Sequence, residues 1–473
     1  MDLLKPLKYA GLNKRMGLKA LTALGIVGPF VKDFANAIEE VKPLTDVDVS
    51  NKPTLLAITS HRFRGDLEIL ANSGNFRVLK IPVEYQKKLI SWFWRKEVSK
   101  VNIDEYFNSA KNEVYRDIQN SLRDFLRIFL PALYARLRVD CVIGAGFHYK
   151  TDFDWGTVSQ EIGIPYVVLH RENLAMLPGQ VALYNDVLEV RHKFRGEHII
   201  VHNQIMKEII SQSGYTDPSK VSALGCLRMD EFVSNTKVEL PRNNERKKIT
   251  AFSFSRGAWI FGSVNFPKDK NAGLAKMFVN FHAAFARLAI EMPEYDFVIK
   301  PKYGGGWTEE IQDAIGKHGM NFDEIQNLSI EPDADVHKLI FASDVIWGFG
   351  STVILEAGIA RKPVIFPLFD EALKPEYADY IMFKEHPDLF DVANSPDDLK
   401  QLTLYRLDNP QIEEYSMVER NALFEKHISS LSSDALEKYI SCISRIINKS
   451  KASVSDMSEN RPKFEQSPYM SVS

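Results

Sequence analysis

The stretch DVIWGFGSTVILEAGIARKPVIFP, residues 344–367, contains a complete strand–turn–helix–strand unit. An apolar strand runs into a turn with two glycines, and the second of them, Gly350, lets the chain bend sharply. Ser351 and Thr352 follow, then a helical segment that carries Glu356, and then a second apolar strand. Short buried strands that alternate with helices are typical of an α/β fold with a parallel sheet.

The same alternation continues on both sides of this unit. In the first half of the chain, strands are expected at PTLLAITS, FRVLKIPV, DCVIGAG, PYVVLHRE and EHIIVHN, with a long helix over 113–139. In the second half, ITAFSFS and YDFVIKPK are strands around a helical stretch. The polar stretch 234–248 has the composition of a linker. We therefore predict an α/β protein of two doubly wound, Rossmann-like domains, whose strand ends face a shared ligand-binding cleft.

Five segments are predicted along the chain. They are a basic, amphipathic N-terminal segment over 1–50, a first Rossmann-like domain over 51–235, a second over 247–410, closing helices over 411–448 and a disordered tail over 449–473. The prediction of a tail rests on the serine-rich, aliphatic-poor composition of the last residues, which cannot build a core.

Composition narrows the classes of protein to which the chain can belong. Its 473 residues are too many for a single core, and a formal net charge of −3 gives no field that would attract nucleic acid. Any anionic ligand must therefore be met by local basic residues. Cys141, Cys226 and Cys442 lie far apart, which argues against a disulfide framework or a cysteine-based zinc site and fits a reducing cytosol.

The N-terminal segment has two interpretations. Several lysines and Arg15 precede or flank the apolar stretch ALTALGIVGPFV, and no run of 18 apolar residues occurs, so we expect no membrane-spanning helix. The segment is either an ordinary surface helix or a basic amphipathic element that rests on an anionic membrane face.

Side chains suited to anion binding follow the strands of the second half. Ser351 and Thr352 would offer hydroxyls and free N–H groups at a helix start, and Glu356 would accept hydrogen bonds from a ribose or sugar hydroxyl. An ordinary capped helix with a surface glutamate explains the same residues. Further candidates on this donor side, each of which also fits a solvated turn, are Lys300 and Lys302 in VIKPKYGGG and Ser253, Ser255 and Arg256 in FSFSRG.

Charged residues follow the strands of the first half. Glu172 in VVLHRENL and Asp230 in LGCLRMDEF are candidate general bases, and Arg228 would hold an anionic donor. The candidates for binding an anionic acceptor are His61, Arg62 and Arg64 in TSHRFRGD, together with His170. Ordinary charged loop ends explain these residues equally well.

Other patterns carry no prediction. The D-x-D pattern of metal-dependent sugar transferases occurs at 152–154 but also at 46–48 and 333–335, which is what chance produces. No Cys/His cluster has zinc spacing, and neither a complete dinucleotide fingerprint nor a Walker motif is present. We expect no metal site and no cofactor.

Three blocks together resemble one known family. SDVIWGFGSTVILEAGIARKPVIFP resembles the donor-site region of two-domain GT-B glycosyltransferases, in the bacterial surface-carbohydrate and capsule branch that includes CDP-glycerol transferases and Kdo (3-deoxy-manno-octulosonic acid) transferases. LGCLRMDEF is similar to the Gly-Cys-Pro-Arg-x-Asp stretch of that branch, with Leu227 in place of proline, and LHRENL to its His-Lys/Arg-Glu segment. The resemblance spans roughly residues 140–445.

The resemblance implies sugar transfer from a nucleotide-activated donor, CMP-Kdo being one example, to a growing surface polysaccharide or lipid-linked glycan such as capsule or lipopolysaccharide. The first domain would bind the acceptor and the second the donor, without an obligatory metal. In an inverting enzyme Glu172 or Asp230 would deprotonate the acceptor; in a retaining one Asp230 would be the nucleophile and Glu172 its acid/base partner. Asp230 is predicted to be the more important of the two carboxylates. A nucleotide-sugar 2-epimerase and a non-catalytic sugar-nucleotide-binding subunit are the alternatives, and the expected location is the cytoplasm or the inner face of the cell membrane.

Overall fold

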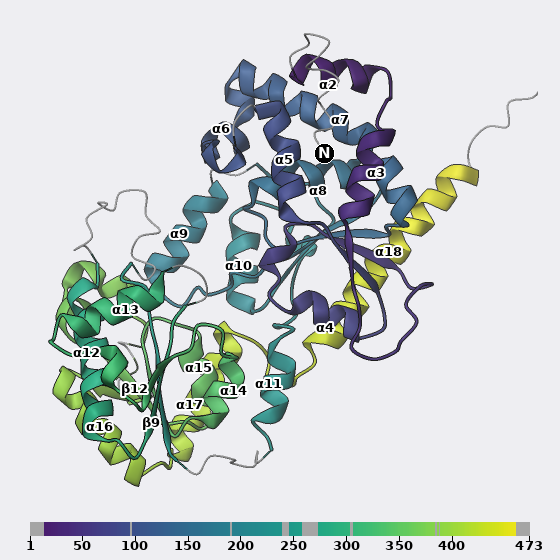
Figure 1. The fold of residues 1–473 in the computed structure, drawn as a ribbon. Coiled ribbons are helices and arrows are strands. Elements are labelled where there is room, and N and C mark those ends of the chain that lie inside the picture. The colour runs from purple at the N-terminus through teal and green to yellow at the C-terminus, as the bar shows by residue number, and fades with distance from the viewer. Residues whose placement is uncertain are drawn as a thin grey trace, which may run out of the picture.

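The computed structural model describes residues 14–94, 97–189, 192–238, 246–257, 273–302, 306–383, 386 and 388–459. These residues form two lobes, each built on one sheet with helices on its faces (Figure 1). The predicted α/β class is confirmed by the topology of both sheets.

The N-terminal domain contains a seven-stranded sheet in the order β1-β3-β2-β4-β5-β6-β7. Every neighbouring pair is parallel except β1–β3. The strands are β1 (Glu39–Val41), β2 (Thr54–Ala57), β3 (Arg77–Lys80), β4 (Cys141–Gly144), β5 (Tyr166–Leu169), β6 (His198–Val201) and β7 (Val221–Ala223). The helices are α2 (Lys14–Ala23), α3 (Gly28–Ala37), α4 (Asp66–Asn72), α5 (Val83–Trp94), α6 (Ile103–Phe107), α7 (Glu113–Leu137), α8 (Lys150–Glu161), α9 (Pro178–Glu189), α10 (Gln204–Gln212) and α11 (Met229–Asn235).

The C-terminal domain contains a six-stranded, fully parallel sheet in the order β10-β9-β8-β11-β12-β13. The strands are β8 (Lys248–Phe252), β9 (Asp296–Lys300), β10 (Leu328–Ile330), β11 (Val345–Gly348), β12 (Val364–Pro367) and β13 (Asp391–Ala393). The helices that follow them are α12 (Ala275–Glu291), α13 (Trp307–Gly316), α14 (Val336–Ala342), α15 (Val353–Ile359), α16 (Pro396–Asp408), α17 (Glu414–His427) and α18 (Ala435–Glu459).

Both sheets are doubly wound, and each therefore has a topological switch point. In the N-terminal sheet the strand order reverses between β2 and β4, and in the C-terminal sheet it reverses between β8 and β11. Loops that leave adjacent strands in opposite directions open a crevice at such a point, which is where doubly wound sheets bind ligands. Two such domains in one chain are the GT-B arrangement.

The described part of the N-terminal segment, residues 14–50, packs as part of the first domain and not apart from it as predicted; residues 1–13 lie outside the described residues. Strand β1 lies at the edge of the sheet, antiparallel to β3. Phe30 and Phe34 of α3 are buried and contact Phe125 and Phe129 of α7, with ring centroids 5.5 and 5.0 Å apart. Most of the apolar face of this segment is therefore inside the domain. No helix in the described ranges is long and apolar enough to cross a bilayer.

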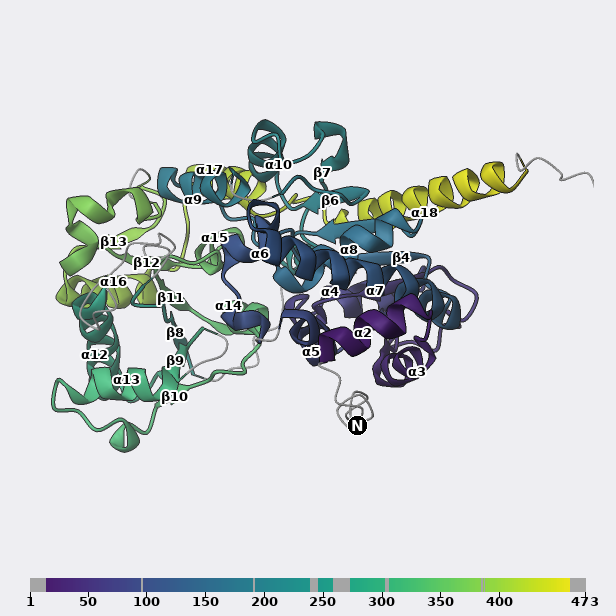
Figure 2. The same cartoon turned by 90° about the horizontal axis from the view of Figure 1, so that it is seen from above.

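The C-terminal helix returns to the first domain. Helix α18 buries Tyr439, Ile443 and Ile447 in the same core cluster as Leu55 of β2 and Leu67 of α4, and it lies along the N-terminal lobe in both views (Figures 1 and 2). The helix continues to Glu459, so the predicted tail was wrong over 449–459. Residues 460–473 lie outside the described residues, as do 239–245 of the predicted linker.

Candidate functional site at the domain junction

The carboxyl ends of both sheets meet at the junction between the domains. Phe232 of α11 stacks on His337 of α14, with ring centroids 4.2 Å apart. The side-chain amide nitrogen (Nδ2) of Asn203, which follows β6, donates to the backbone carbonyl of His427 at 2.6 Å. Elements that follow β6 and β7 are thereby held against α17, which follows β13, and α14, which follows β10. The predicted candidate residues follow strands of both sheets.

A buried charged cluster lies on the N-terminal side of the junction. Arg171, two residues after β5, forms an ion pair with Asp66 in the first turn of α4, and their side chains are only 8% and 7% exposed. Within the described part of the chain, Asp66 Oδ1 and the Nη1 of Arg228 are buried without a hydrogen-bond partner. Buried charged atoms are costly unless a partner compensates them, so this cluster has unused capacity for a polar ligand.

The electrostatics of the cluster have identifiable causes. Burial raises the pKa of Asp66, and the positive charges of Arg171 and Arg228 oppose this shift. Burial lowers the pKa of Arg64, and the same two arginines lower it further. An additional anion would relieve the repulsion among these three guanidinium groups.

The turn that follows β2 carries three of the predicted acceptor residues. Thr59, Arg64 and Gly65 all have positive φ, at 49°, 48° and 99°. This region is rarely occupied by a β-branched residue. Surrounding contacts hold Thr59 there, since its N–H donates to Gln86 Oε1 at 2.8 Å and its hydroxyl donates to Asp152. The turn presents exposed side chains of His61, Arg62 and Arg64.

Asp152 is a residue that motif reasoning passed over. It belongs to the D-x-D pattern that repeats by chance, yet it is buried in the first turn of α8 and bonded to Thr59 at the switch point. Burial raises the pKa of Asp152 to about 7, partly offset by the hydrogen bonds that it accepts. Its position supports the acceptor turn and does not indicate a metal ligand.

The two predicted catalytic carboxylates have different surroundings. Glu172 is half-exposed; the hydroxyl of Tyr149 donates to it at 3.2 Å and His148 Nε2 lies 3.5 Å from it. Both oxygens of Asp230 instead accept N–H groups at the start of α18, from Ala435 at 3.2 Å and Leu436 at 2.8 Å. These contacts leave the carboxylate of Glu172 half-exposed and engage both oxygens of Asp230 at the start of α18.

His170 is placed differently from its predicted role. The side chain is fully buried and stacked on Phe147, with ring centroids 4.4 Å apart, so it does not face an acceptor at the surface. Burial lowers the pKa of His170 well below its ordinary value, with a further contribution from His148. The neutral ring supports the loop that carries Glu172.

On the C-terminal side, the predicted turn lies at the switch point between β8 and β11. Gly350 has a φ of 59°, as the sharp bend requires, and Ser351 and Thr352 are partly exposed. The N–H of Glu356 donates to the carbonyl of Thr352 at 3.2 Å, so these residues are one helical turn apart as predicted. Glu356 itself is buried, with its carboxylate 3.4 Å from His337 Nε2 and within electrostatic range of Arg228.

The basic residues predicted on this side are largely engaged within the fold. Lys300 is buried, and its ammonium group donates to the carbonyls of Pro301 at 3.1 Å and Pro332 at 2.6 Å. Arg256 pairs with Glu310 of α13 at 2.9 Å. Lys302 is exposed, and the glycines at 304 and 305 lie outside the described residues.

The two serines of the FSFSRG turn remain near the switch point. Ser253 and Ser255 are both partly exposed just after β8. The rings of Phe254 and Phe349 lie 5.0 Å apart and join this turn to the one that follows β11. Together with Ser351 and Thr352, these serines give the C-terminal side of the junction a set of neutral hydroxyls.

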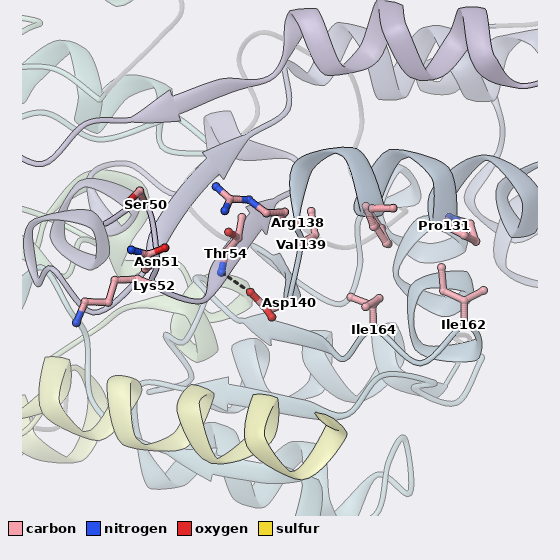
Figure 3. Close-up of a pocket in the computed structure, with 12 residues that line it drawn as sticks. Ser50, Asn51, Lys52, Thr54, Pro131, Arg138, Val139, Asp140, Ile162 and Ile164 are labelled. Carbon is pink, nitrogen blue, oxygen red and sulfur yellow. Dashed lines mark hydrogen bonds between the residues drawn. The ribbon is translucent and has the colours of Figure 1, made fainter. Parts of the chain in front are cut away.

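Two cavities elsewhere on the protein include one predicted site residue, Arg256. One of about 580 Å³ lies at the opposite, amino-terminal edge of the first sheet, where Thr54 begins β2 and Val139 and Asp140 precede β4 (Figure 3). Another of about 340 Å³ lies between α12 and α13 and includes Arg256. Among the residues with described positions, no group of three or more His, Cys, Asp or Glu side chains is arranged to hold a metal ion.

Comparison with known proteins gives distant structural similarity only. No protein-family model and no curated protein sequence matches the chain. Similar solved structures include a UDP-GlcNAc 2-epimerase from Neisseria meningitidis bound to UDP-GlcNAc, with 13% identity over 83% of this chain and 99% of that chain and a TM-score of 0.44. A variant of the wall teichoic acid polymerase TagF shows 11% identity over 92% and 97% of the two chains, with a TM-score of 0.45.

A third similar structure is MurG from Acinetobacter baumannii, with 14% identity over 83% of this chain and 99% of that chain and a TM-score of 0.41. At these values the comparisons add no argument about chemistry. The assignment of two doubly wound domains therefore rests on the strand order and direction in this chain itself.

Proposed function

We propose that this protein is a glycosyltransferase that moves a sugar from a nucleotide-activated donor to a growing surface polysaccharide or lipid-linked glycan. The observation that carries the proposal is that loops of different chemistry, one set after the strands of each sheet, lie at one junction. Unpaired buried charge at Arg228 and Asp66 faces the same junction as the hydroxyl turns after β8 and β11. Such a junction can hold an anionic substrate on one side and a nucleotide on the other.

In the proposed mechanism Glu172 removes the proton from the attacking acceptor hydroxyl. Its half-exposed carboxylate can reach a ligand, whereas the carboxylate of Asp230 is occupied at α18. Partly exposed hydroxyls of Ser255, Ser351 and Thr352 would donate hydrogen bonds to the leaving phosphate. This mechanism needs no metal ion, and an undiminished rate in EDTA is the expected result.

The arginines favour a substrate with its own negative charge. Arg62, Arg64, Arg171 and Arg228 share the N-terminal side of the junction. The side chain of Arg171 is only 8% exposed, and Arg228 is partly exposed with its Nη1 atom buried. We propose that the transferred sugar or the acceptor carries a carboxylate or phosphate, as Kdo does. We also propose that the protein acts at the inner face of the cell membrane. The exposed side chains of Leu24 and Ile26, beside α2, would contact the membrane.

A ligand panel followed by a turnover assay tests the proposal. CMP, CDP, UDP, GDP and TDP would be compared by thermal shift, since a nucleotide that binds the native state raises its melting temperature. The selected nucleotide sugar would then be incubated with and without candidate glycan acceptors. Conversion of UDP-GlcNAc without any acceptor would instead identify an epimerase, and the absence of all nucleotide binding would overturn the proposal.

A further inference from the structure

A buried imidazole lies directly beneath the first turn of the C-terminal domain. His282 of α12 is completely buried and contacts Ser253, the residue that follows β8. Its Nδ1 lies 2.7 Å from the carbonyl oxygen of Phe278, and its Nε2 lies 2.9 Å from the hydroxyl oxygen of Ser253. Nothing in the proposed mechanism uses this histidine.

The two contacts determine where the protons lie. A carbonyl oxygen can only accept a hydrogen bond, so Nδ1 of His282 carries the proton. Burial lowers the pKa of His282 to about 4, so the ring is neutral near pH 7 and has a single N–H. Nε2 is then an acceptor, and the hydroxyl of Ser253 must donate its only proton to it. The oxygen of Ser253 is left with lone pairs alone for any ligand.

Ser255, two residues later on the same turn, has the opposite character. Its oxygen accepts the backbone N–H of Gly257 at 3.2 Å, which leaves the hydroxyl proton available. The oxygens of an ionised diphosphate accept hydrogen bonds and have none to donate. Ser255 is therefore suited to phosphate, whereas the lone pairs of Ser253 repel it.

Ser253 also lies where a ligand would reach it. Phe252 pairs with Gly348 across β8 and β11, so Ser253 leaves the sheet beside the turn that contains Ser351. Its side chain is partly exposed, in contrast to the buried ring behind it. The hydroxyl is thus held from within by a buried ring, on a residue that is itself partly exposed.

We propose that Ser253 is a specificity-determining hydrogen-bond acceptor, which His282 positions, and that it binds a neutral O–H or N–H group of the nucleotide or its sugar rather than a phosphate. This inference rests on the proposed function, because it names what part of the nucleotide sugar lies over this turn. Ser253 was predicted only as a donor-binding residue, and this inference gives it a role different from that of Ser255 and Ser351. The phosphates would then lie toward Ser255 and Ser351, with a ribose or sugar group over Ser253.

Two alanine variants of the full chain test the inference as a matched pair. Calorimetry would compare Ser253→Ala and Ser255→Ala for three probes: pyrophosphate, the nucleotide selected by the panel above, and the matching nucleotide sugar. We expect Ser253→Ala to leave pyrophosphate affinity unchanged and to weaken the nucleotide sugar about tenfold, and Ser255→Ala to weaken all three. If Ser253→Ala already weakens the binding of the nucleotide, the contacted group lies on its ribose or base. A drop confined to the nucleotide sugar places it on the transferred unit.

Two calorimetric outcomes would overturn the inference. In the first, Ser253→Ala weakens the binding of pyrophosphate as much as Ser255→Ala does. In the second, Ser253→Ala changes none of the three affinities. Nitrogen-15 NMR of the histidine rings gives a readout that is independent of any ligand, so a failure of the proposed function is distinguishable. We expect His282 protonated on Nδ1 only, with a shifted Nε2 signal in Ser253→Ala; a proton on Nε2 of the wild-type ring would also refute the inference.

Discussion

The loops that follow the strands of the two sheets meet at the domain junction, and they are called the N-terminal edge and the C-terminal edge below. The two edges carry different chemical groups. The N-terminal edge holds full charges, several of them buried, around the Arg171–Asp66 pair and a turn with left-handed residues. The C-terminal edge holds neutral hydroxyls; its Lys300 and Arg256 are bound to other groups of their own domain, and Lys302 is exposed. The difference indicates that strong electrostatic attraction comes from one domain and directional hydrogen bonding from the other.

The largest effect is expected at Glu172, the exposed carboxylate of the charged edge. Glu172→Gln should lower kcat by at least about 100-fold, because the amide cannot remove the acceptor proton. The melting temperature should stay close to that of the wild type, since the side chain is half-exposed. Turnover with the selected nucleotide sugar measures the effect, and a loss of less than threefold would remove Glu172 from the mechanism.

Arg171→Met should produce the largest loss of stability. Removal of Arg171 leaves the buried carboxylate of Asp66 without its ion-pair partner, with only the charge of Arg228 nearby, which costs about 3 kcal/mol of unfolding free energy. Urea denaturation would measure the change. The double variant Asp66→Leu/Arg171→Met is the control, and it should recover a substantial part of the loss because no buried charge of the pair remains.

Stability should depend on the protonation of Asp152. Its pKa is raised in the folded state, so the folded protein binds a proton that the unfolded chain releases above about pH 4. This contribution is complete at low pH and is lost as the pH rises through about 7. Relative to Asp152→Asn, the wild type should therefore lose up to about 1.4 kcal/mol of unfolding free energy per pH unit between about pH 5 and 7. A difference that does not vary with pH would contradict the assignment.

The hydroxyl edge should respond more weakly and only in binding. Ser351→Ala is expected to weaken nucleotide affinity about tenfold or less, because a single hydrogen bond is lost. Stability should be nearly unchanged, since among the described residues the hydroxyl accepts one long bond, from the N–H of Val353 at 3.4 Å. Calorimetry with the selected nucleotide measures the effect. An affinity equal to that of the wild type would show that the phosphates lie elsewhere.

The smallest effect is expected at Asp230, whose carboxylate accepts two N–H groups at the start of α18. Asp230→Ala should cost about 1 kcal/mol of stability through the loss of a helix cap and leave kcat within a few-fold of the wild type. Asp230→Asn keeps one acceptor and should cost less. A 100-fold loss of turnover in both variants, with stability retained, would restore Asp230 as the catalytic carboxylate.

Local patterns predicted the fold well but predicted individual roles less well. The block that contains Gly350 and Thr352 forms the predicted strand, turn and helix, because glycine placement and apolar periodicity act over a few residues. One partner of Lys300 is 32 residues away in the chain and those of Asp230 are more than 200 residues away, so no local pattern reveals them. Asp152 was missed for the same reason, since only the fold brings it to Thr59.

The course of α18 has a consequence for the order in which the protein is made. Leu55 and Leu67 belong to the domain that leaves the ribosome first, yet they are covered by Ile443 and Ile447 near the end of the chain. At ordinary rates of translation, roughly 10 to 40 s separate the synthesis of the first domain from the synthesis of α18. During that interval the newborn first domain exposes an unfinished apolar surface. We expect premature termination before α18 to yield a chaperone-bound or aggregated fragment rather than a free-standing domain.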